Sequence, residues 1–354
     1  MKQFHALTVA NKREETRDSV RLALDVPEEL RSEFEFMPGQ HLPIRILRDG
    51  KALRRTYSIC SEPGAWPLEI GIRVQPGGRF SEFAANELQL GDQLEVMPPF
   101  GQFHASPESS NEKTYLGFAS GSGITPILSI IASILSNEPG SQFCLFYGNR
   151  KQSTTMFIDD LYALKNRYPE RLQLHFVFSQ EEQEFAIAAG RLDRDKVREL
   201  WACFCRGIGV DEAFICGPDS MIEDVTGALI ELGMQSECIH SERFGAPRKT
   251  TRPTLETDTA DAATITVIMD GHKKSFDMND SDENIVNAAA EHGIDLPYSC
   301  KGGVCATCRC HIRDGSVVMA TNYGLEPWEV EAGFVLACQS RPTSKTVTLD
   351  YDKT

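Results

Sequence analysis

The chain of 354 residues lacks an apolar run long enough to cross a bilayer. From Met1 to Asp18 it mixes charges of both signs and has no apolar core of the kind found in secretory signal peptides. Basic residues are scarce: 36 Lys and Arg stand against 51 Asp and Glu, giving a formal net charge of -15 spread along the chain. Nucleic acid and anionic membranes are therefore poor partners, whereas a basic protein surface suits this charge. We expect a cytoplasmic protein.

The cysteines do not form an even set. There are eleven of them; five lie between Cys300 and Cys338, and six are scattered through the first 240 residues. In a reducing compartment this distribution favours a metal site with additional buried thiols over a framework of disulfides. The sequence also contains no internal repeat and no low-complexity tract.

The length exceeds one ordinary core and indicates two or three domains, of which the motifs below favour three. In the first hundred residues short apolar runs alternate with polar residues, as in Leu42 to Ile46 and Leu68 to Val74. This strand periodicity, interrupted by Gly and Pro, predicts an antiparallel β-barrel over residues 1–108.

From Tyr115 the pattern changes to strands that alternate with helices. Apolar strands are expected at 115–119, 143–147, 172–178 and 213–216, with helices at 126–135 and from Ser220. Such alternation predicts a parallel α/β sheet over residues 112–245. The polar residues 246–262, rich in Thr, Pro, Arg and Asp, are typical of a linker.

Residues 263–354 are expected to form a third, α+β domain of the β-grasp type. Two strands, 264–269 and 273–278, flank Asp270-Gly271, a dipeptide that favours a β-hairpin. Ser281 or Asp282 is then predicted to cap a helix through 284–291.

The strongest motif is Cys300-x4-Cys305-x2-Cys308, followed by Cys338 after a further 29 residues. This is the plant-type [2Fe-2S] spacing, so these four cysteines are the predicted metal ligands. Three thiolates on one loop reach a cluster only if the backbone folds around it, and Gly302 and Gly303 remove side chains that would prevent this. Their amides could then point at the sulfur atoms.

Two other interpretations of this loop compete with the predicted ligand set. A structural zinc site would normally need two C-x-x-C knuckles, and this region has one. Cys310, two residues after Cys308, could substitute as a ligand, but strand alternation favours a place in the small core.

A second motif, Arg55-Thr56-Tyr57-Ser58, stands at a strand end, and Gly77 to Ser81 opens a short helix. A flavin diphosphate needs an arginine, small residues and free amides at a helix start, because the helix dipole and unpaired donors meet its negative charge. Tyr57 could stack on the isoalloxazine ring, and Ser58 could hydrogen-bond near its N5. Alone, four residues fit a capped strand with a core tyrosine equally well. The candidate flavin residues are Arg55, Tyr57, Ser58, Gly78 and Ser81.

A third motif, Gly121-Ser122-Gly123-Ile124-Thr125-Pro126, follows a buried strand and begins a helix. This is the context of a dinucleotide pyrophosphate site, although the full G-x-G-x-x-G fingerprint is missing. Cys216-Gly217-Pro218 ends another strand, where α/β sheets bind ligands. Arg150 is placed to meet a 2′-phosphate and Arg191 could assist, which favours NADPH over NADH. The candidate nucleotide residues are Gly121, Gly123, Thr125, Pro126, Arg150, Arg191, Gly217 and Pro218.

Together these motifs resemble the ferredoxin-NADP reductase superfamily. Its flavin domain carries R-x-Y-S and a G-x-x-S turn, and its nucleotide domain carries G-x-G-x-x-P and C-G-P. The resemblance implies FAD as the flavin, Cys216 beside the nicotinamide, Glu242 near it, and Phe244 over the flavin face. The residues it places at the reaction are Tyr57, Ser58, Cys216 and Glu242.

A hydride carries two electrons and a [2Fe-2S] cluster accepts one, so a flavin between them is needed to divide the pair. The order flavin, nucleotide, cluster therefore describes a reductase that feeds a separate acceptor. The acceptor is not expected within this chain, because Glu237-x-x-His240 is a single E-x-x-H motif and a di-iron bundle needs two.

The whole chain resembles reductase subunits of multicomponent di-iron monooxygenases, which implies NADPH and di-iron oxygenase subunits as partners. The stretches that carry this resemblance are Leu53 to Cys60, Phe146 to Arg150, Asp211 to Pro218, Leu296 to Cys310 and Thr321 to Pro327. Three alternatives stay open: a reductase for a Rieske or other hydroxylase, a redox sensor that holds flavin and cluster without turnover, and a zinc-bound interaction module.

Overall fold

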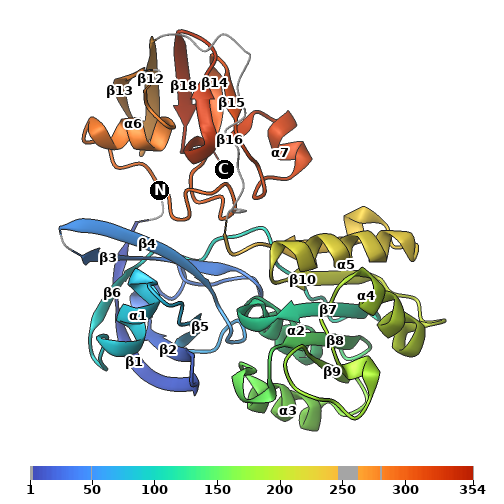
Figure 1. Cartoon of the computed structure of the whole chain (residues 1–354). Helices are drawn as coiled ribbons and strands as arrows, with labels where there is room; N and C mark the ends of the chain where they lie inside the picture. The colour runs from blue at the N-terminus through green and yellow to red at the C-terminus, as the bar shows by residue number, and fades with distance from the viewer. Residues whose placement is uncertain (1–2, 49, 246–261, 280, 354) are drawn as a thin grey trace. The chain divides into compact units, whose positions relative to one another are not determined.

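The computed structural model describes residues 3–48, 50–245, 262–279 and 281–353, and Figure 1 labels its elements. The chain divides into two compact units. One comprises His5–Ile46 and Tyr57–Phe244, and the other comprises Gly245–Thr354 with Met1–Phe4 and Leu47–Thr56. Of the predicted linker, residues 246–261 lie outside the described residues, and Ala262 already belongs to strand β12. Among the described helices, none combines the length and the apolar character needed to cross a membrane.

The N-terminal strands form an antiparallel sheet of six, in the order β4-β3-β6-β1-β2-β5. They are β1 (His5–Thr16), β2 (Ser19–Asp25), β3 (His41–Arg48), β4 (Lys51–Ser58), β5 (Leu68–Arg73) and β6 (Gln93–Val96), with helix α1 (Arg79–Asn86) between β5 and β6. An antiparallel bridge between Ile59, just after β4, and Ile70 of β5 joins the two ends of this order. The sheet therefore closes, as the strand periodicity predicted, around fully buried residues such as Leu7 and Leu22.

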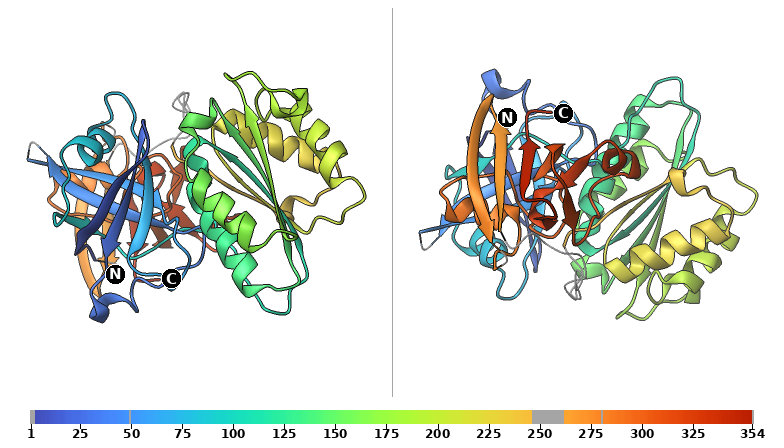
Figure 2. Two further views of the ribbon diagram at one scale, coloured as in Figure 1. Left: turned by 90° about the horizontal axis from the view of Figure 1, so that it is seen from below. Right: turned by 90° about the horizontal axis from the view of Figure 1, so that it is seen from above.

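The nucleotide region forms a parallel sheet of five strands in the order β11-β10-β7-β8-β9. They are β7 (Thr114–Ser120), β8 (Gln142–Asn149), β9 (Leu172–Phe178), β10 (Glu212–Cys216) and β11 (Ile239–Glu242). Successive strand residues point to opposite faces: Tyr115 packs with the core that contains α2, and Leu116 packs with the core that contains α5. Figure 2 shows the sheet between two layers of helices, made by α2 (Ile124–Asn137), α3 (Ile158–Arg167), α4 (Arg194–Leu200) and α5 (Asp219–Glu231). The predicted parallel α/β sheet is confirmed.

The C-terminal region forms a mixed sheet of five strands in the order β13-β12-β18-β14-β16, in which β12 and β18 are parallel. The strands are β12 (Ala262–Met269), β13 (His272–Asn279), β14 (Arg309–Asp314), β16 (Phe334–Leu336) and β18 (Thr346–Asp350). Strands β15 (Val317–Met319) and β17 (Ser340–Pro342) pair separately, and the helices are α6 (Ile285–Glu291) and α7 (Pro327–Glu331). Asp270 and Gly271 both have positive φ, 51° and 74°, as the predicted two-residue hairpin turn requires.

The predicted cap of the helix after β13 is wrong. The residue that caps α6 is Asn284, whose side chain accepts a hydrogen bond from the Asn287 amide at 3.0 Å. The carboxylate of Asp282 accepts instead from the amide of Asn279 at 2.7 Å. Asp282 therefore closes the turn that ends β13 and is not available to the helix.

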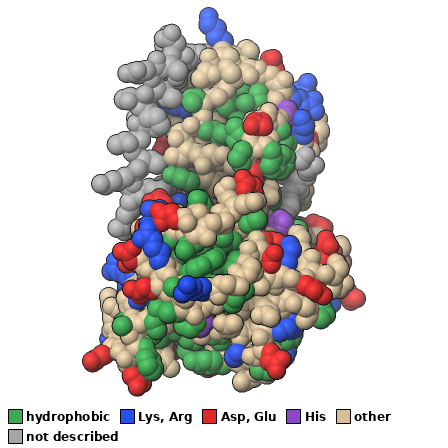
Figure 3. All heavy atoms as spheres, turned by 90° about the vertical axis from the view of Figure 1, so that its right-hand side faces the viewer, with side chains coloured by type: hydrophobic (Ala, Val, Ile, Leu, Met, Phe, Trp, Pro, Cys, Tyr) green, Lys and Arg blue, Asp and Glu red, His purple; other side chains and the backbone are tan. Residues whose placement is uncertain are grey.

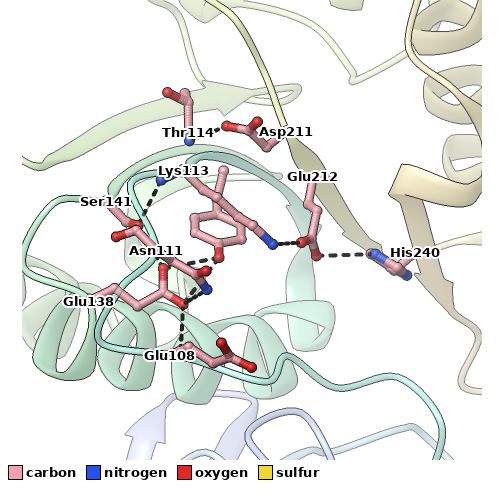
Figure 4. Close-up of polar contacts among 10 residues, drawn as sticks. Glu108, Asn111, Lys113, Thr114, Glu138, Ser141, Asp211, Glu212 and His240 are labelled. Atoms are coloured by element: carbon pink, nitrogen blue, oxygen red, sulfur yellow. Dashed lines mark hydrogen bonds and ion pairs between the residues drawn. The ribbon is translucent and has the colours of Figure 1, made fainter.

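A buried carboxylate organises the segment between the barrel and the parallel sheet. Glu138, at the end of α2, is fully buried and accepts hydrogen bonds from four groups, which Figure 4 draws. They are the Glu108 amide (3.1 Å), Asn111 Nδ2 (2.8 Å), the Tyr115 hydroxyl (3.0 Å) and the Ser141 hydroxyl (2.6 Å). Burial, aided by Glu138, raises the pKa of Tyr115, so the phenol remains a donor. The carboxylate thus ties the incoming chain to β7 and α2.

A second charged group lies at the same end of the sheet. Lys113 Nζ is 2.6 Å from Glu212 Oε1, and His240 Nε2 is 3.3 Å from Glu212 Oε2. The hydrogen bond from His240, followed by that from Lys113, lowers the pKa of Glu212 to about 2. His240 therefore joins β11 to β10 through Glu212.

Replacing Glu138 with Ala should lower the free energy of unfolding by an amount on the order of 3 kcal/mol, because buried donors would lose a charged acceptor. Urea unfolding followed by circular dichroism measures the change. The exposed Glu170 is the control, and Glu170→Ala should shift the free energy by less than about 0.5 kcal/mol. Equal effects of the two changes would contradict this role for Glu138.

Candidate functional site

The four predicted cysteine ligands are brought together by the loop before β14 and by a short turn after β16. Cys305, Cys308 and Cys338 are 5%, 2% and 2% exposed, and all eleven cysteines of the chain are free thiols. The side chains of Cys300 and Cys305 hydrogen-bond to each other, and those of Cys308 and Cys338 form a second pair. The loop therefore presents its thiols as two pairs.

Backbone amides point at these sulfur atoms. The amides of Gly302 and Cys305 donate to Cys300 Sγ at 3.3 and 3.4 Å, and the Cys300 amide donates to Cys305 Sγ at 3.4 Å. Hydrogen bonding from the Cys305 thiol, together with these amides, lowers the pKa of Cys300 to about 5. The loop therefore stabilises negative charge on sulfur.

The loop can curve this tightly because three of its residues have positive φ. Lys301 and Ala306 lie at 51° and 49°, and Gly303 lies at 74°. A Cβ on Gly303 would stand 3.1 Å from side-chain atoms of Thr321 and Gln339. The prediction that a glycine leaves room for this bend therefore holds at Gly303. Lys301 and Ala306 adopt strained, left-handed backbone conformations in the same loop.

This donor set fits a two-iron cluster. Four thiols in two pairs, with amides aimed at sulfur, match the ligation of [2Fe-2S] centres by four cysteine thiolates. Cys310 is 1% exposed, its sulfur lies 3.9 Å from the Val335 carbonyl, and burial raises its pKa to about 12.

The flavin motif lies on β4 and beside the start of α1. The rings of Tyr57 and Phe80 are 5.3 Å apart, which places the tyrosine next to the first turn of the helix. Ser81 is buried, accepts from the Gln75 amide at 3.1 Å and donates to the Gly78 carbonyl at 3.3 Å. Ser81 therefore shapes the turn before α1. Arg55 is exposed at the strand end, and its Nη1 donates to the Arg54 carbonyl at 2.7 Å.

The carboxylate of Glu242 joins two sequence-distant side chains. Ser58 Oγ donates to Glu242 Oε2 at 3.3 Å, and Glu242 Oε1 is 3.2 Å from His41 Nδ1. Ser58 and His41 are buried, and Glu242 ends β11 with its side chain 11% exposed. The structure thus brings Ser58 and Glu242 together, a contact that the sequence did not predict. His41 was missed, because a single histidine before an apolar strand carries no motif.

The two glycine motifs of the nucleotide region pack directly on each other. A Cβ on Gly123 would stand 2.0 Å from the Cys216 carbonyl oxygen, and one on Gly217 would stand 2.7 Å from the end of Met221. Gly121 has φ of 55°, a conformation that suits glycine. Burial, and to a smaller extent Glu242, raises the pKa of the Cys216 thiol, which therefore stays protonated at neutral pH. The glycine loop and the C-G-P turn form one edge of the sheet.

Other residues of the glycine loop have structural contacts. Thr125 Oγ1 donates to the Ser122 carbonyl at 3.0 Å, and both Thr125 and Pro126 are buried in α2. Pro218 precedes α5 as its N-cap. Tyr147, fully buried on β8, donates to the Gly121 carbonyl at 2.8 Å and was missed as a support of this loop. The sequence feature that could have identified Tyr147 is its position in the stretch Phe146 to Arg150, which carries the family resemblance.

The remaining predicted ligands are exposed. Arg150 follows β8 and Arg191 follows the bridge between Phe178 and Ala189, so both stand where neighbouring parallel strands end. This is the edge at which such sheets bind ligands. Phe244, two residues after β11, is 49% exposed.

Three family descriptions match successive parts of the chain. Residues 6–105 match an oxidoreductase FAD-binding domain, residues 118–227 an oxidoreductase NAD-binding domain, and residues 267–343 a 2Fe-2S iron-sulfur cluster binding domain. The chain thus contains an FAD-binding, an NAD-binding and a [2Fe-2S] domain, in the order that the motifs predicted.

Among characterised proteins, the chain is 45% identical to one of the subunits of 1,2-phenylacetyl-CoA epoxidase of Escherichia coli K12, over 99% of each chain. It is 34% identical to the ferredoxin reductase component of 3-ketosteroid-9-alpha-monooxygenase of Rhodococcus rhodochrous, over 98% of this chain and 96% of that one. It is 26% identical to a glycine betaine monooxygenase reductase subunit of Pseudomonas aeruginosa, over 90% and 88%.

Among solved structures, phthalate dioxygenase reductase matches with a TM-score of 0.59 and 22% identity, over 98% of each chain. An intact type IV self-sufficient cytochrome P450 monooxygenase matches with a TM-score of 0.69 and 19% identity, over 98% of this chain and 41% of that one. These two likenesses concern the fold alone. The three domain matches, together with the 45% and 34% identity over nearly the whole chain, show that the chain belongs to the ferredoxin-NADP reductase-type family of monooxygenase reductase components.

Proposed function

We propose that this reductase takes hydride from NADPH and passes single electrons through FAD and a [2Fe-2S] cluster to the di-iron oxygenase of phenylacetyl-CoA 1,2-epoxidase. The observation that supports this partner is the 45% identity to the epoxidase relative over 99% of each chain. When bound, the flavin accepts an electron pair and releases it singly, and the cluster carries one electron at a time. We further infer a cytoplasmic location, since all eleven cysteines are free thiols.

In this proposal the cluster ligands are Cys300, Cys305, Cys308 and Cys338. Two thiol pairs, in which Cys305, Cys308 and Cys338 are buried, and amides directed at sulfur support the assignment. The amides would hold the thiolates in position and favour added negative charge on them.

The residues proposed at the flavin are Tyr57 and Ser58, with Gly78, Ser81 and Arg55 toward the diphosphate. Tyr57 offers a half-buried ring beside Phe80, and the turn shaped by Ser81 opens α1, where an anion is favoured. Glu242 accepts the hydrogen bond from the Ser58 hydroxyl and so orients it. Glu242 also contacts His41, so the three side chains form a largely buried polar cluster. Phe244 is proposed to cover the flavin face.

The proposed nucleotide site lies at the edge formed by Gly121 to Pro126 and Cys216 to Pro218. Cys216 supplies an uncharged, buried contact for the nicotinamide. Exposed Arg150 and Arg191 at the ends of the strands support NADPH over NADH, because guanidinium groups bind phosphate strongly.

A second acceptor class has some support. The 34% identity to the ferredoxin reductase component of 3-ketosteroid-9-alpha-monooxygenase favours a different hydroxylase as the next candidate. A redox sensor without turnover lacks comparable support.

Gly123→Ala should slow reduction of the flavin by NADPH by about ten-fold or more, which corresponds to roughly 1.4 kcal/mol. The added Cβ would collide with the Cys216 carbonyl and push the two loops apart. Stopped-flow absorbance of the flavin measures the rate. Gly209→Ala is the control, because no atom lies within 4 Å of its Cβ position, and it should leave the rate unchanged.

Cys308→Ser should remove the cluster and stop electron delivery to the oxygenase while NADPH still reduces the flavin. The visible absorbance and iron content of the folded protein report the cluster. Cys310→Ala is the matched control and should keep the iron, because Cys310 faces the core. Loss of the iron from both variants would contradict the proposed ligand set.

Mixing the purified protein with the phenylacetyl-CoA oxygenase subunits under air should give NADPH consumption that depends on phenylacetyl-CoA and equals epoxide formed. Parallel assays with a 3-ketosteroid hydroxylase test the second candidate. NADPH consumption coupled to product formation by the 3-ketosteroid hydroxylase, but not by the phenylacetyl-CoA oxygenase, would contradict the proposed partner. The proposed reductase chemistry would still stand.

A further inference from the structure

The C-terminal domain exposes large apolar side chains on and beside the short helix α7. Tyr323 is 42% exposed, Trp328 is 59% exposed and Val330 is 40% exposed. We call these three residues, with the exposed carboxylates Glu326 and Glu331, the α7 patch. Figure 3 views the molecule from the side on which α7 lies in Figure 1, and in its upper part apolar side chains stand beside carboxylates. Three exposed large apolar residues between positions 323 and 330 suit an interaction surface.

The patch is held rigidly. Asn322 closes the turn before the helix, with its side chain bonded to the Leu325 amide and carbonyl at 2.9 and 3.0 Å. The Glu326 amide donates to the Glu329 carboxylate at 3.0 Å, and Arg309 Nε donates to the same carboxylate at 2.7 Å. Glu329 is fully buried. The exposed Trp328 therefore sits on a fixed scaffold, which lowers the entropy cost of binding a partner.

The patch is also attached to the cysteine loop. The Tyr323 amide donates to the Gly303 carbonyl at 2.9 Å, inside the loop that carries Cys300 and Cys305. A Cβ on Gly324 would stand 2.6 Å from the Val304 carbonyl oxygen, so the two segments are in close contact. Electron transfer weakens steeply with distance, so an acceptor must approach the surface nearest the cluster. The α7 patch is part of that surface.

The charge of the patch defines its partner. From Ala320 to Phe334 the sequence has three glutamates and no lysine or arginine, and Arg309 neutralises the buried one. Residues 262–354 together contain thirteen acidic and eight basic residues. A partner must therefore offer an apolar hollow for an aromatic side chain and Lys or Arg around it.

We propose that the α7 patch is the docking surface for the electron-accepting oxygenase, with Trp328 as the central anchor and Glu326 and Glu331 facing basic residues of the oxygenase. The inference rests on the proposed function, since it takes the oxygenase as the occupant. Tryptophan and tyrosine are the residues that most often dominate such interfaces.

The test compares Trp328→Ala, Trp328→Phe and Glu331→Lys in the full chain. Trp328→Ala should raise the KM for the oxygenase about ten-fold or more, and Trp328→Phe should recover most of the loss. Glu331→Lys should raise the KM and flatten its dependence on salt. Reduction of ferricyanide by NADPH should be unchanged in all three, because a small anion needs no docking surface. Phe185→Ala, which changes a 66% exposed aromatic of the nucleotide region, is the control and should have no effect.

Several outcomes would overturn the docking proposal. An unchanged KM for the oxygenase in Trp328→Ala would show that the anchor lies elsewhere. Slower reduction of the cluster by NADPH without oxygenase would show that the patch serves transfer within this chain, and a smaller sedimentation coefficient would show that it joins two copies. If the wild-type protein reduces ferricyanide but no oxygenase, the proposed function has failed, independently of these variants.

Discussion

Three thiols within nine residues can face one point only if the backbone bends around them, and the C-terminal domain depends on this constraint. The bend places Lys301, Gly303 and Ala306 at positive φ and turns amides toward Cys300 and Cys305. The fourth thiol arrives from the end of β16, where the Ala337 amide donates to the Cys308 carbonyl at 3.2 Å. The loop is thus hydrogen-bonded to the chain next to Cys338, the fourth proposed ligand.

A comparable constraint governs the nucleotide region. Two loops that follow neighbouring parallel strands share one edge, and Gly123 is tolerated there only because it lacks a Cβ. Tyr147 supports the first loop from β8, and Cys216 supplies the second from β10. In our proposal the dinucleotide binds at these strand ends, where backbone amides can meet phosphate.

Charge is distributed to match these tasks. Carboxylates inside the molecule are satisfied by several donors, as at Glu138 and Glu212, and they stabilise junctions between elements. Carboxylates on α7 remain at the surface beside Trp328. Inside the molecule, carboxylates thus join neighbouring elements. On α7, in our proposal, they bind a partner, and the difference between the two roles is whether the side chain is buried.

The sequence by itself determined the classes of element, and it supplied the four cysteines that we propose as cluster ligands. Periodicity reports which face of a strand is buried, and the spacing of Cys300, Cys305 and Cys308 limits which thiols can meet on one loop. The sequence did not identify the residue that caps α6, because Ser281, Asp282 and Asn284 are all residue types that favour this position. In the structure, Asp282 instead accepts a hydrogen bond in the turn after β13, and Asn284 caps the helix. Only the tertiary structure decided that Ser58 and His41 meet Glu242, which lies 184 and 201 residues away in the chain. Contacts of that separation depend on how the sheets fold and pack, and no local pattern in the sequence records them.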